Sequence, residues 1–581
     1  MKSPLLSLAL LALIMASLAF TFREQFKTSS TDRKQVPAHY KQVIRCGPDW
    51  EVLSQWLEET DIPPIPGAGS YTWSISSRHD SARFYFNQGI NMYYSFHIIE
   101  AMASFKKASR FDPESAILYW AQALAYGPNI NDYGYAATPA ALAAVSKAQQ
   151  FSTGATDLEK ALINAMAVRY TADSADTNRK QLNEAYTAKM AELYQSFPGE
   201  GDVAALYADA MMLEHPWDLW TPDGNPKAWT PLIRQVLEKA LASTPQNPGL
   251  NHYYIHVMEP SPEAAKALAS ADRLGKLTPG LSHTVHMPSH IYLRTGQFDK
   301  GIRVNEEAVK SYKHSIPLFA PVTGADFLYI IHNLHMQVNN AMMAGQYSKA
   351  VQSADELVSN IPESYLDFPG AMGNLLQYIY MTPVFNEIRF GQWQALINRK
   401  PPPEKQTYGR ILWLFGRGMA LSHQQKLTEA KEILEQMKLL AKDSVLAIPF
   451  TPFSPASDGV TIAVEMLHGT ILLQEGKWPA AIEAFRSAVV TEASMVYNEP
   501  RDWILNPRHY LANAYLKAGQ PEEAIKTLKD DLLVNNENGW ALFGYWQALL
   551  KQKKSKEAAS VKSRFDKSFS KATITLSAPV F

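Results

Sequence analysis

The stretch "ARFYFNQGINMYYSFHIIEAMASFKKASRFDPE", residues 82–114, indicates how this 581-residue chain folds. Its small, aromatic and proline residues follow one another at spacings of 12, 4, 3 and 5: Gly89, Ala101, Phe105, Ala108 and Pro113. A second stretch, "IAVEMLHGTILLQEGKWPAAIEAFRSAVV", residues 462–490, repeats the first three spacings: Gly469, Ala481, Phe485 and Ala488. Such residues let two antiparallel helices cross closely, and a proline ends the second helix. Both stretches therefore predict helical hairpins.

The hairpin pattern recurs in units that begin near residues 248, 282, 331, 377, 411, 505 and 537. A turn glycine, an aromatic residue and an alanine mark many of them, as in "EGKWPAA" at 475–481. Residues 155–245 read as helices with weaker marks, interrupted by the loop "EHPWDLWTPDGNPKAW". The spacings resemble the 34-residue tetratricopeptide (TPR) repeat. This resemblance predicts an all-α, TPR-type helical-hairpin solenoid over residues 81–581, with a concave groove along the stacked repeats.

The first 22 residues predict an export signal. A lysine precedes a long apolar run, and Ser17, Leu18 and Ala19 form a small-x-small cleavage site. We therefore expect an exported protein, periplasmic or secreted, or one anchored in the membrane by this segment if it stays uncleaved. Residues 23–80 are predicted to be polar and mostly irregular. The single cysteine, Cys46, excludes internal disulfides and thiolate metal clusters.

Charge and motif content exclude several classes of function. The 55 basic and 56 acidic side chains nearly cancel, so we expect no nucleic-acid partner. The sequence has no glycine-rich phosphate loop, dinucleotide fingerprint or nucleophile elbow between a strand and a helix. We expect the groove to hold a small molecule or a peptide, or a partner protein.

The histidines are concentrated in one region, with eight of the 15 lying between residues 252 and 335. In TPR arrays, the second, fifth, ninth and twelfth residues of each repeat's first helix line the groove. Repeats that begin at 248, 282 and 331 place seven histidines at such positions: His252, His256, His283, His286, His290, His332 and His335. Glu259 takes the twelfth position of the first of these repeats.

The spacing of these imidazoles suits a transition-metal site. His252 and His256 are four residues apart, so they share one helix face with Cβ atoms about 6 Å apart. The histidines of 283–290 span two turns, and one ion can take at most two of the three. Pro288 either kinks that helix or marks its true start. Imidazoles with one carboxylate suit copper, iron or zinc. We predict one ion at a point where ring nitrogens converge from His252, His256 and at least one of His286, His290 and His335.

Other candidates lie outside this region. His97 and Glu100 stand where the first repeat turns into its second helix, and an ordinary helix turn also accounts for them. In the loop "LEHPWDLWTPDG", His215 and Asp218 could reach a site, and Trp217 could stack on a ligand. The "TPDG" of the same loop is also a common turn sequence.

A further resemblance goes beyond the repeat itself. The blocks "PWDLWTPDGNP", "NHYYIHVMEPSPE" and "SHTVHMPSHIYLRTGQ" are similar to those of a group of exported bacterial TPR proteins. The resemblance implies the fold and no reaction.

Two functions remain open at this stage. In the first, the groove binds a transition metal through its histidines. If the protein is an enzyme, the metal would activate water or dioxygen, with Glu259 as a ligand or general base. In the second, the protein is a non-catalytic scaffold that binds a peptide or partner protein in the groove, and its mostly uncharged histidines serve only as hydrogen-bonding groups.

Overall fold

The computed structural model describes residues 50, 53 and 57, then 61–133, 136–315, 317–319, 325–450 and 452–581. The expected export signal at residues 1–22, Cys46 and much of the segment 23–80 lie outside this part. Residues 61–79 are described and contain no helix. Within the described residues, no helix has the length and apolar character needed to cross a lipid bilayer.

The described chain is built from helices. The first half contains α3 Asp80–Tyr93, α4 Ile98–Phe111, α5 Ala116–Ala125, α6 Thr138–Gln150, α7 Asp157–Ala167, α8 Arg179–Ser196, α9 Gly201–Glu214, α10 Thr230–Ser243, α11 Pro248–Met258, α12 Leu268–Leu277, α13 Ser282–His286 and α14 Pro288–Arg294. The second half contains α15 Phe298–Ser315, α16 Ala325–Met343, α17 Tyr347–Ser359, α18 Gly370–Tyr380, α19 Thr382–Arg389, α20 Trp393–Asn398, α21 Thr407–His423, α22 Leu427–Leu440, α23 Ala456–Gln474, α24 Trp478–Ser494, α25 Pro507–Lys517, α26 Pro521–Val534, α27 Gly539–Lys551 and α28 Ser555–Ser568. Short 3-10 helices are η2 Ser152–Gly154, η3 Ala264–Ala267, η5 Glu363–Asp367 and η6 Ser444–Ala447. β-structure among the described residues is limited to isolated bridges, and the all-α prediction is confirmed.

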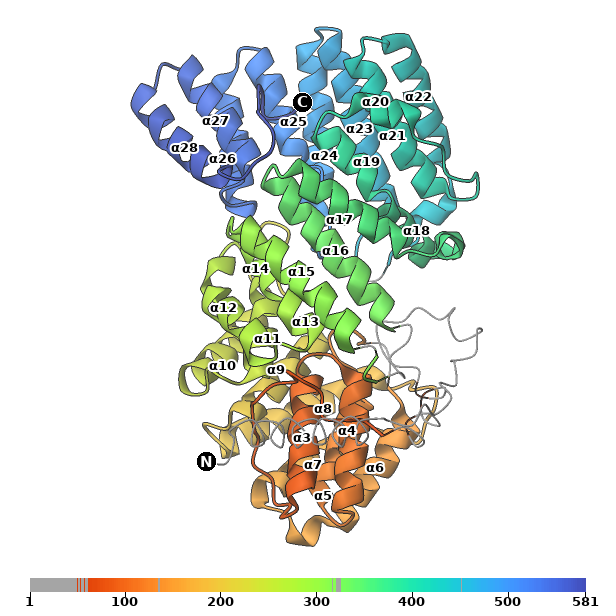
Figure 1. Cartoon of the computed structure of the whole chain (residues 1–581), viewed down its shortest axis with the longest axis vertical. Coiled ribbons are helices and arrows are strands. Elements are labelled where there is room, and N and C mark those ends of the chain that lie inside the picture. The colour runs from red at the N-terminus through yellow and green to blue at the C-terminus, as the bar shows by residue number, and fades with distance from the viewer. Residues whose placement is uncertain are drawn as a thin grey trace, which may run out of the picture. The chain divides into compact units, whose positions relative to one another are not determined.

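Consecutive helices pair as antiparallel hairpins, and the glycines marked in the sequence lie where they cross (Figure 1). A Cβ atom added at Gly89 on α3 would lie 2.4 Å from the ring of Phe105 on α4. The equivalent distance from Gly469 on α23 to the Phe485 ring on α24 is 2.8 Å. Both rings are fully buried. The spacing of 12 and 4 residues therefore reports a real helix crossing, and the TPR-type solenoid is confirmed.

We expect the substitution Gly89→Ala to lower the free energy of unfolding by about 1–2 kcal/mol. The overpacking cost of about 1–3 kcal/mol is reduced by alanine's better helix propensity of about 1 kcal/mol. Chemical denaturation followed by circular dichroism measures the change. Gly154→Ala is the matched control, because a Cβ atom there meets nothing within 4 Å. Equal stabilities for the two variants would contradict the crossing.

The repeat boundaries follow the predicted register in part. The units predicted near 505 and 537 begin at Pro507 and Gly539, but those predicted near 377 and 411 fall inside α18 and α21. Helices α11 and α13 begin at Pro248 and Ser282, as expected. Pro288 starts the separate helix α14, because proline lacks the N–H that an interior position needs and suits the first turn. Helix α16 begins at Ala325, six residues before the predicted start at 331. Residues 325–330 contain neither glycine nor proline, so nothing in them stops the helix from extending upstream.

The apolar side chains form two main cores, and the histidine-rich helices lie where the two meet. The first core is built from residues 50–292 together with Phe319, and it includes Tyr253 on α11 and Ile291 on α14. The second is built from residues 302–580, and it includes Leu334 on α16 and Ile504 before α25. Helices α11 and α14 are thus held by one core, which also contains Leu281 and Met287 at the two ends of α13, while α16 and the segment before α25 are held by the other.

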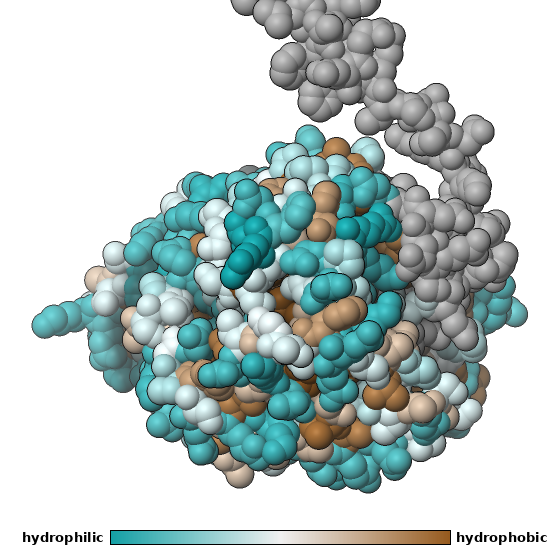
Figure 2. Space-filling view, turned by 90° about the horizontal axis from the view of Figure 1, so that it is seen from below, coloured by the Kyte–Doolittle hydropathy of each residue, from teal (hydrophilic) through white to brown (hydrophobic). Residues whose placement is uncertain are grey.

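The outer surface is largely polar. Figure 2 shows one face, on which hydrophilic side chains surround scattered apolar ones. Large hydrophobic side chains that are strongly exposed in the described part, such as Leu439 and Leu533, occur singly. Single exposed apolar residues are normal for a folded protein and do not mark a binding site.

Candidate metal centre

Three consecutive hairpins bring six histidines together. His252 and His256 lie on α11, which begins with Pro248 at its first position. His283 and His286 lie on α13, His290 on α14 and His332 on α16. Five of the six side chains are buried and His332 is half-buried. The cluster is therefore enclosed, rather than spread along the open groove that the sequence suggested.

The first three histidines form a compact triad. The Nε2 atom of His252 lies 3.1 Å from that of His256 and 3.1 Å from that of His283. One ring nitrogen from each residue lies within 4.8 Å of the other two. We call this group the first triad.

The second triad joins the two short helices to α16. The Nε2 atom of His286 lies 2.7 Å from that of His290 and 2.9 Å from that of His332. These nitrogens also lie within 4.8 Å of one another. The triads are adjacent, since the ring centroids of His283 and His286 are 6.1 Å apart.

The other ring nitrogens show where the protons are. The Nδ1 atom of His252 lies 2.6 Å from the backbone oxygen of Tyr94, which can only accept a hydrogen bond. The Nδ1 atom of His286 lies 2.5 Å from Oδ1 of Asn305, and the Asn305 amide nitrogen donates to Gly301, which fixes the orientation of that amide. Both Nδ1 atoms therefore donate, and a neutral imidazole then presents a bare lone pair at Nε2. This is the arrangement in which histidine binds metals.

Glu259 connects the two triads. Its Oε1 atom lies 2.9 Å from Nδ1 of His256, and its Oε2 atom lies 2.6 Å from Nδ1 of His290. The hydroxyl of Tyr497 donates to Oε2 at 3.0 Å. The Glu259 side chain is fully buried. A carboxylate in this position orients the His256 imidazole through a hydrogen bond, which is a common role for residues just outside a metal's ligands. Its contact with Nδ1 of His290 is close but lacks hydrogen-bond geometry.

Glu499 is a member of the site that sequence reasoning missed. It lies in the segment 495–506 between α24 and α25, which reaches the cluster from the second core. Its carboxylate oxygens lie 3.6 Å from Nδ1 of His256, 3.8 Å from Nδ1 of His290 and 3.9 Å from Nε2 of His332. With His256 and Glu259 it forms a third group that could hold a cation. Its only signal is a lone glutamate in "YNEPRDW", far from the histidine region, so no spacing argument could find it.

The electrostatic environment keeps most of the imidazoles uncharged. Burial lowers the pKa of five of them: His252, His283 and His286 well below the ordinary value, and His290 and His332 to about 4. Burial alone would lower the pKa of His256 too, but hydrogen bonds with Glu259 and Glu499 outweigh it and raise that pKa to about 9.

Two aromatic residues with unusual backbone angles border the first triad. Phe96 has φ of 57° and Trp217 has φ of 60°, values that bulky residues rarely adopt. The Phe96 ring centroid lies 4.5 Å from that of His252 and 5.2 Å from that of His283. Trp217 meets His256 edge-on at 5.5 Å. Strained backbone persists where the surrounding structure enforces it, and such positions concentrate at functional sites. Trp217 was a predicted wall residue, and Phe96 was missed.

The cluster opens into a cavity of about 610 Å³. His283 of the first triad and His332 of the second both line it, as does Glu499. Its remaining wall is mainly aromatic and apolar, and includes Trp217 and Phe453. A molecule in the cavity therefore reaches both triads.

His335 and His97 were predicted at the site, but the structure places both outside the two triads. The His335 ring is buried and lies edge-on to Tyr378, with centroids 5.9 Å apart. It still lines the cavity. His97 lies 3.1 Å from Glu100 and stacks on Tyr312. The predicted single centre is thus divided differently: His252 and His256 join His283, while His286 and His290 join His332. The break at Pro288 turns His283 and His290 toward different partners.

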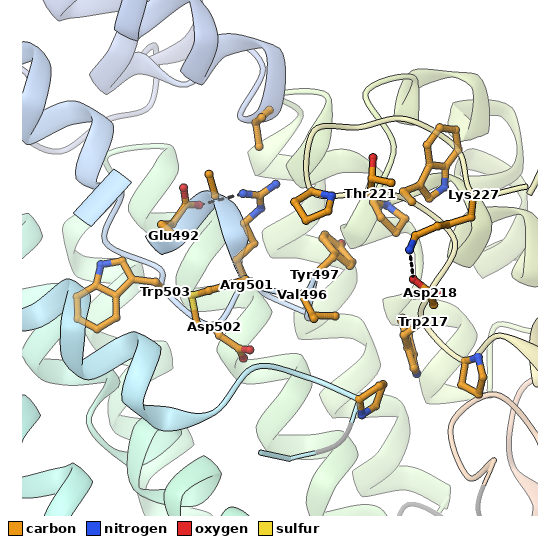
Figure 3. Close-up of a pocket in the computed structure, with 18 of the residues that line it drawn as sticks. Trp217, Asp218, Thr221, Lys227, Glu492, Val496, Tyr497, Arg501, Asp502 and Trp503 are labelled. Atoms are coloured by element: carbon orange, nitrogen blue, oxygen red, sulfur yellow. Dashed lines mark hydrogen bonds and ion pairs between the residues drawn. The ribbon is translucent and has the colours of Figure 1, made fainter. Parts of the chain in front are cut away.

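The loop between α9 and α10 holds two further candidates away from the cluster. His215 stacks on Trp229 with centroids 3.6 Å apart. Asp218 pairs with Lys227 at 2.9 Å, on the wall of a separate crevice of about 440 Å³ that Figure 3 shows. Tyr497 lines the same crevice, so the hydroxyl that contacts Glu259 belongs to a residue reachable from this side.

Comparisons with known proteins add nothing about the site. No family model matches the sequence, and no curated protein matches it. Human IFIT1 in a dimer with m7Gppp-AAAA is 11% identical over 84% of this chain and 90% of its own, with a TM-score of 0.30. The Cut9–Hcn1 hetero-tetramer of the APC/C is 14% identical over 90% of this chain and 81% of its own, with a TM-score of 0.26. The P58(IPK) TPR domain is 14% identical over 78% of this chain and 99% of its own, with a TM-score of 0.21. Such low values support no inference about function. The helices and the cluster themselves define the class: an all-α, TPR-type solenoid with a buried histidine cluster.

Proposed function

We propose that this protein is a metal-binding TPR solenoid that holds two transition-metal ions, one in each histidine triad. The observation that carries the proposal is the convergence of three Nε2 atoms in the second triad, where the lone pair of His286 faces the ring nitrogens of both His290 and His332 at 2.7 and 2.9 Å. His290 has a carboxylate oxygen 2.6 Å from Nδ1 and the Nε2 atom of His286 2.7 Å from its own Nε2.

The proton count at His290 leads to a cation. His286 has committed its proton to Asn305, so its Nε2 presents a lone pair. Burial lowers the pKa of His290 to about 4, so at neutral pH this ring also has one proton. If that proton lies on Nδ1, facing Glu259, two lone pairs oppose each other at 2.7 Å. If it lies on Nε2, it can bond to His286, but Nδ1 then stays buried 2.6 Å from a carboxylate oxygen without a hydrogen bond. A metal ion bound to the Nε2 atoms removes the conflict.

The distances suit one ion in each triad. Two nitrogens that bind the same tetrahedral ion through bonds of about 2 Å lie about 3.3 Å apart. The contacts between neighbouring Nε2 atoms, 2.7 to 3.1 Å, are slightly shorter, and the remaining nitrogen pair in each triad lies within 4.8 Å. All-imidazole sites suit copper, zinc and iron. Three protein ligands also leave a coordination position for another molecule, as catalytic metal sites do.

The first triad supports the proposal less strongly, because a proton could hold it together. His256 has a pKa of about 9, so it can carry a proton on each nitrogen, donating to Glu259 and to His252. The same geometry accepts a metal once that proton leaves, since metal binding displaces protons from its ligands.

The open position indicates a metalloenzyme. His283 and His332 line the cavity, so each triad presents its ion to whatever enters. Bound metal ions activate water or dioxygen, and the carboxylates of Glu259 and Glu499 lie close enough to the imidazoles to accept a proton. A non-catalytic scaffold that holds a peptide or partner protein is the alternative, and a protein that keeps its fold but retains no metal would favour it.

Metal titration of chelator-treated protein tests the proposal. We expect about two ions of zinc, copper or iron per chain, measured by elemental analysis after removal of free metal. Each occupied site raises the free energy of unfolding by about 2.7 kcal/mol when free metal exceeds its Kd 100-fold. Retention of no ion, with an unchanged melting temperature for all three metals, would end the proposal.

We also propose that the chain is exported, on the basis of the lysine and apolar run within residues 1–22. Fractionation of cells that express the full chain tests this. Recovery in the cytoplasmic fraction alone would contradict it.

A further inference from the structure

We infer that the 610 Å³ cavity above the two triads binds an uncharged aromatic alcohol, a phenol, with its ring against the aromatic wall and its hydroxyl at the histidines. This inference rests on the proposed function, because it names the class of molecule that would bind beside the two metal ions. The cavity's size is within the range of small-molecule sites, roughly 300–1,000 Å³.

The wall of the cavity favours a flat apolar body. Aromatic rings come from separate parts of the chain: Trp217 before α10, Tyr329 on α16, Tyr378 on α18 and Phe453 before α23. Trp217 and Phe453 already contact each other at 5.8 Å with tilted planes. Rings in such positions bind another ring face-on or edge-on, and a single phenol is small enough to fit between them.

The histidine end of the cavity offers hydrogen bonds that no described residue takes up. Nδ1 of His283 and Nε2 of His335 are buried, and neither has a hydrogen-bond partner within the described chain. The two residues are 3% and 4% exposed, and both line the cavity. A buried polar atom without a partner costs about 1–3 kcal/mol, so a ligand hydroxyl that reaches either nitrogen recovers that cost. Since a hydroxyl both donates and accepts, it suits a neutral imidazole in either tautomer.

The charge of the metal-free cavity disfavours anionic ligands. The described residues that line it include no lysine and no arginine, but they include the carboxyl groups of Asp132, Glu499 and Asp502. In the metal-free protein, a carboxylate or phosphate ligand would therefore find no lysine or arginine among the described lining residues, whereas an uncharged phenol finds donors and acceptors.

Binding of 4-methylphenol, measured by isothermal titration calorimetry on metal-free and on metal-loaded full-length protein, tests the inference. We expect a Kd below about 1 mM for at least one form. The matched anion, 4-methylbenzoate, should bind the metal-free protein at least tenfold more weakly. N-acetyl-tyrosinamide carries the same phenol on a peptide unit, and its binding relative to 4-methylphenol shows whether the ligand is a free phenol or a tyrosine side chain.

Two variants locate the binding. Met372→Trp fills the cavity and should weaken 4-methylphenol at least tenfold, while Leu439→Trp, on the exposed surface, should change nothing. His335→Phe removes a polar nitrogen and keeps a ring. It should weaken 4-methylphenol about two- to tenfold and leave the binding of toluene unchanged.

The outcomes separate this inference from the proposed function. If neither form binds 4-methylphenol, if 4-methylbenzoate binds the metal-free protein equally well, or if both cavity variants bind like the parent protein, the inference is wrong even when two metal ions are retained. If 4-methylphenol binds as expected and no metal is retained, the cavity assignment stands and the metal proposal fails.

Discussion

Replacing His286 with alanine is expected to lower the bound metal from about two ions per chain to about one. His286 lies at the centre of the second triad, with its Nε2 within 2.7 Å of His290 and 2.9 Å of His332. Its loss leaves two imidazoles, too few for a structural or catalytic site of the usual type. The metal-dependent gain in unfolding free energy should fall by the contribution of one site, about 2.7 kcal/mol at 100-fold excess over Kd.

The companion variant at the first triad is His252→Ala, which should also leave about one ion, and the double variant should bind none. His314→Ala is the matched control, because His314 is exposed and hydrogen-bonds only the backbone of its own helix at Lys310. Elemental analysis of all four proteins, with circular dichroism to confirm the helices, completes the experiment. Full metal content in both triad variants would show that the ions lie elsewhere.

Glu259→Gln is expected to weaken metal binding at both triads by about 10–100-fold, the usual effect of losing a residue that orients metal ligands. One carboxylate oxygen contacts His256 and the other contacts His290. A glutamine has a single oxygen, so it can accept from only one of these rings and presents N–H groups to the other. The ring that faces the amide nitrogen must give up its Nδ1 proton, which moves the proton to Nε2 and blocks the metal.

Competition with a chelator of known affinity measures this loss at each site. Glu263→Gln is the matched control, since Glu263 lies four residues away, is exposed, and pairs with Arg234 and Lys266. Tyr497→Phe removes only the hydroxyl that donates to Glu259, so its effect should be smaller than that of Glu259→Gln. If Glu259→Gln binds both ions as tightly as the parent chain, Glu259 is a packing residue and does not orient the ligands.

The sequence predicted the helical framework well because the relevant signals are local. The positions of Gly89 and Phe105 reflect two helices that are adjacent in the chain, and their crossing appears as predicted. Pro288 is also a local signal. Because it lacks an N–H, it suits the first turn of a helix, and α14 begins at this residue. The starts of α16, α18 and α21 were misplaced, because the TPR register marks the repeat and not the residue at which a helix first forms.

The candidate site was foreseen in its composition and not in its arrangement. His252 and His256 share a helix face, so their closeness follows from the helix repeat. The identity of the third histidine in their triad does not follow from the helix repeat. The choice between His283 and His290 depends on how α13 and α14 pack on α11. His335 illustrates the limit: it occupies a predicted groove position, yet its ring lies beside Tyr378 and contacts neither triad.

Taken by itself, the sequence determined which segments are helical, how they pair as hairpins, and that an unusual number of imidazoles lies on three neighbouring hairpins. These properties depend on contacts between residues close in the chain, which spacing records directly. The tertiary structure decided the division into two triads and the entry of Glu499 and Tyr497. These two residues lie more than 200 positions beyond His290 and reach the site only because the second core holds the segment 495–506 against the first. Contacts of this kind depend on how the helices pack over the whole solenoid, and no local spacing carries that information.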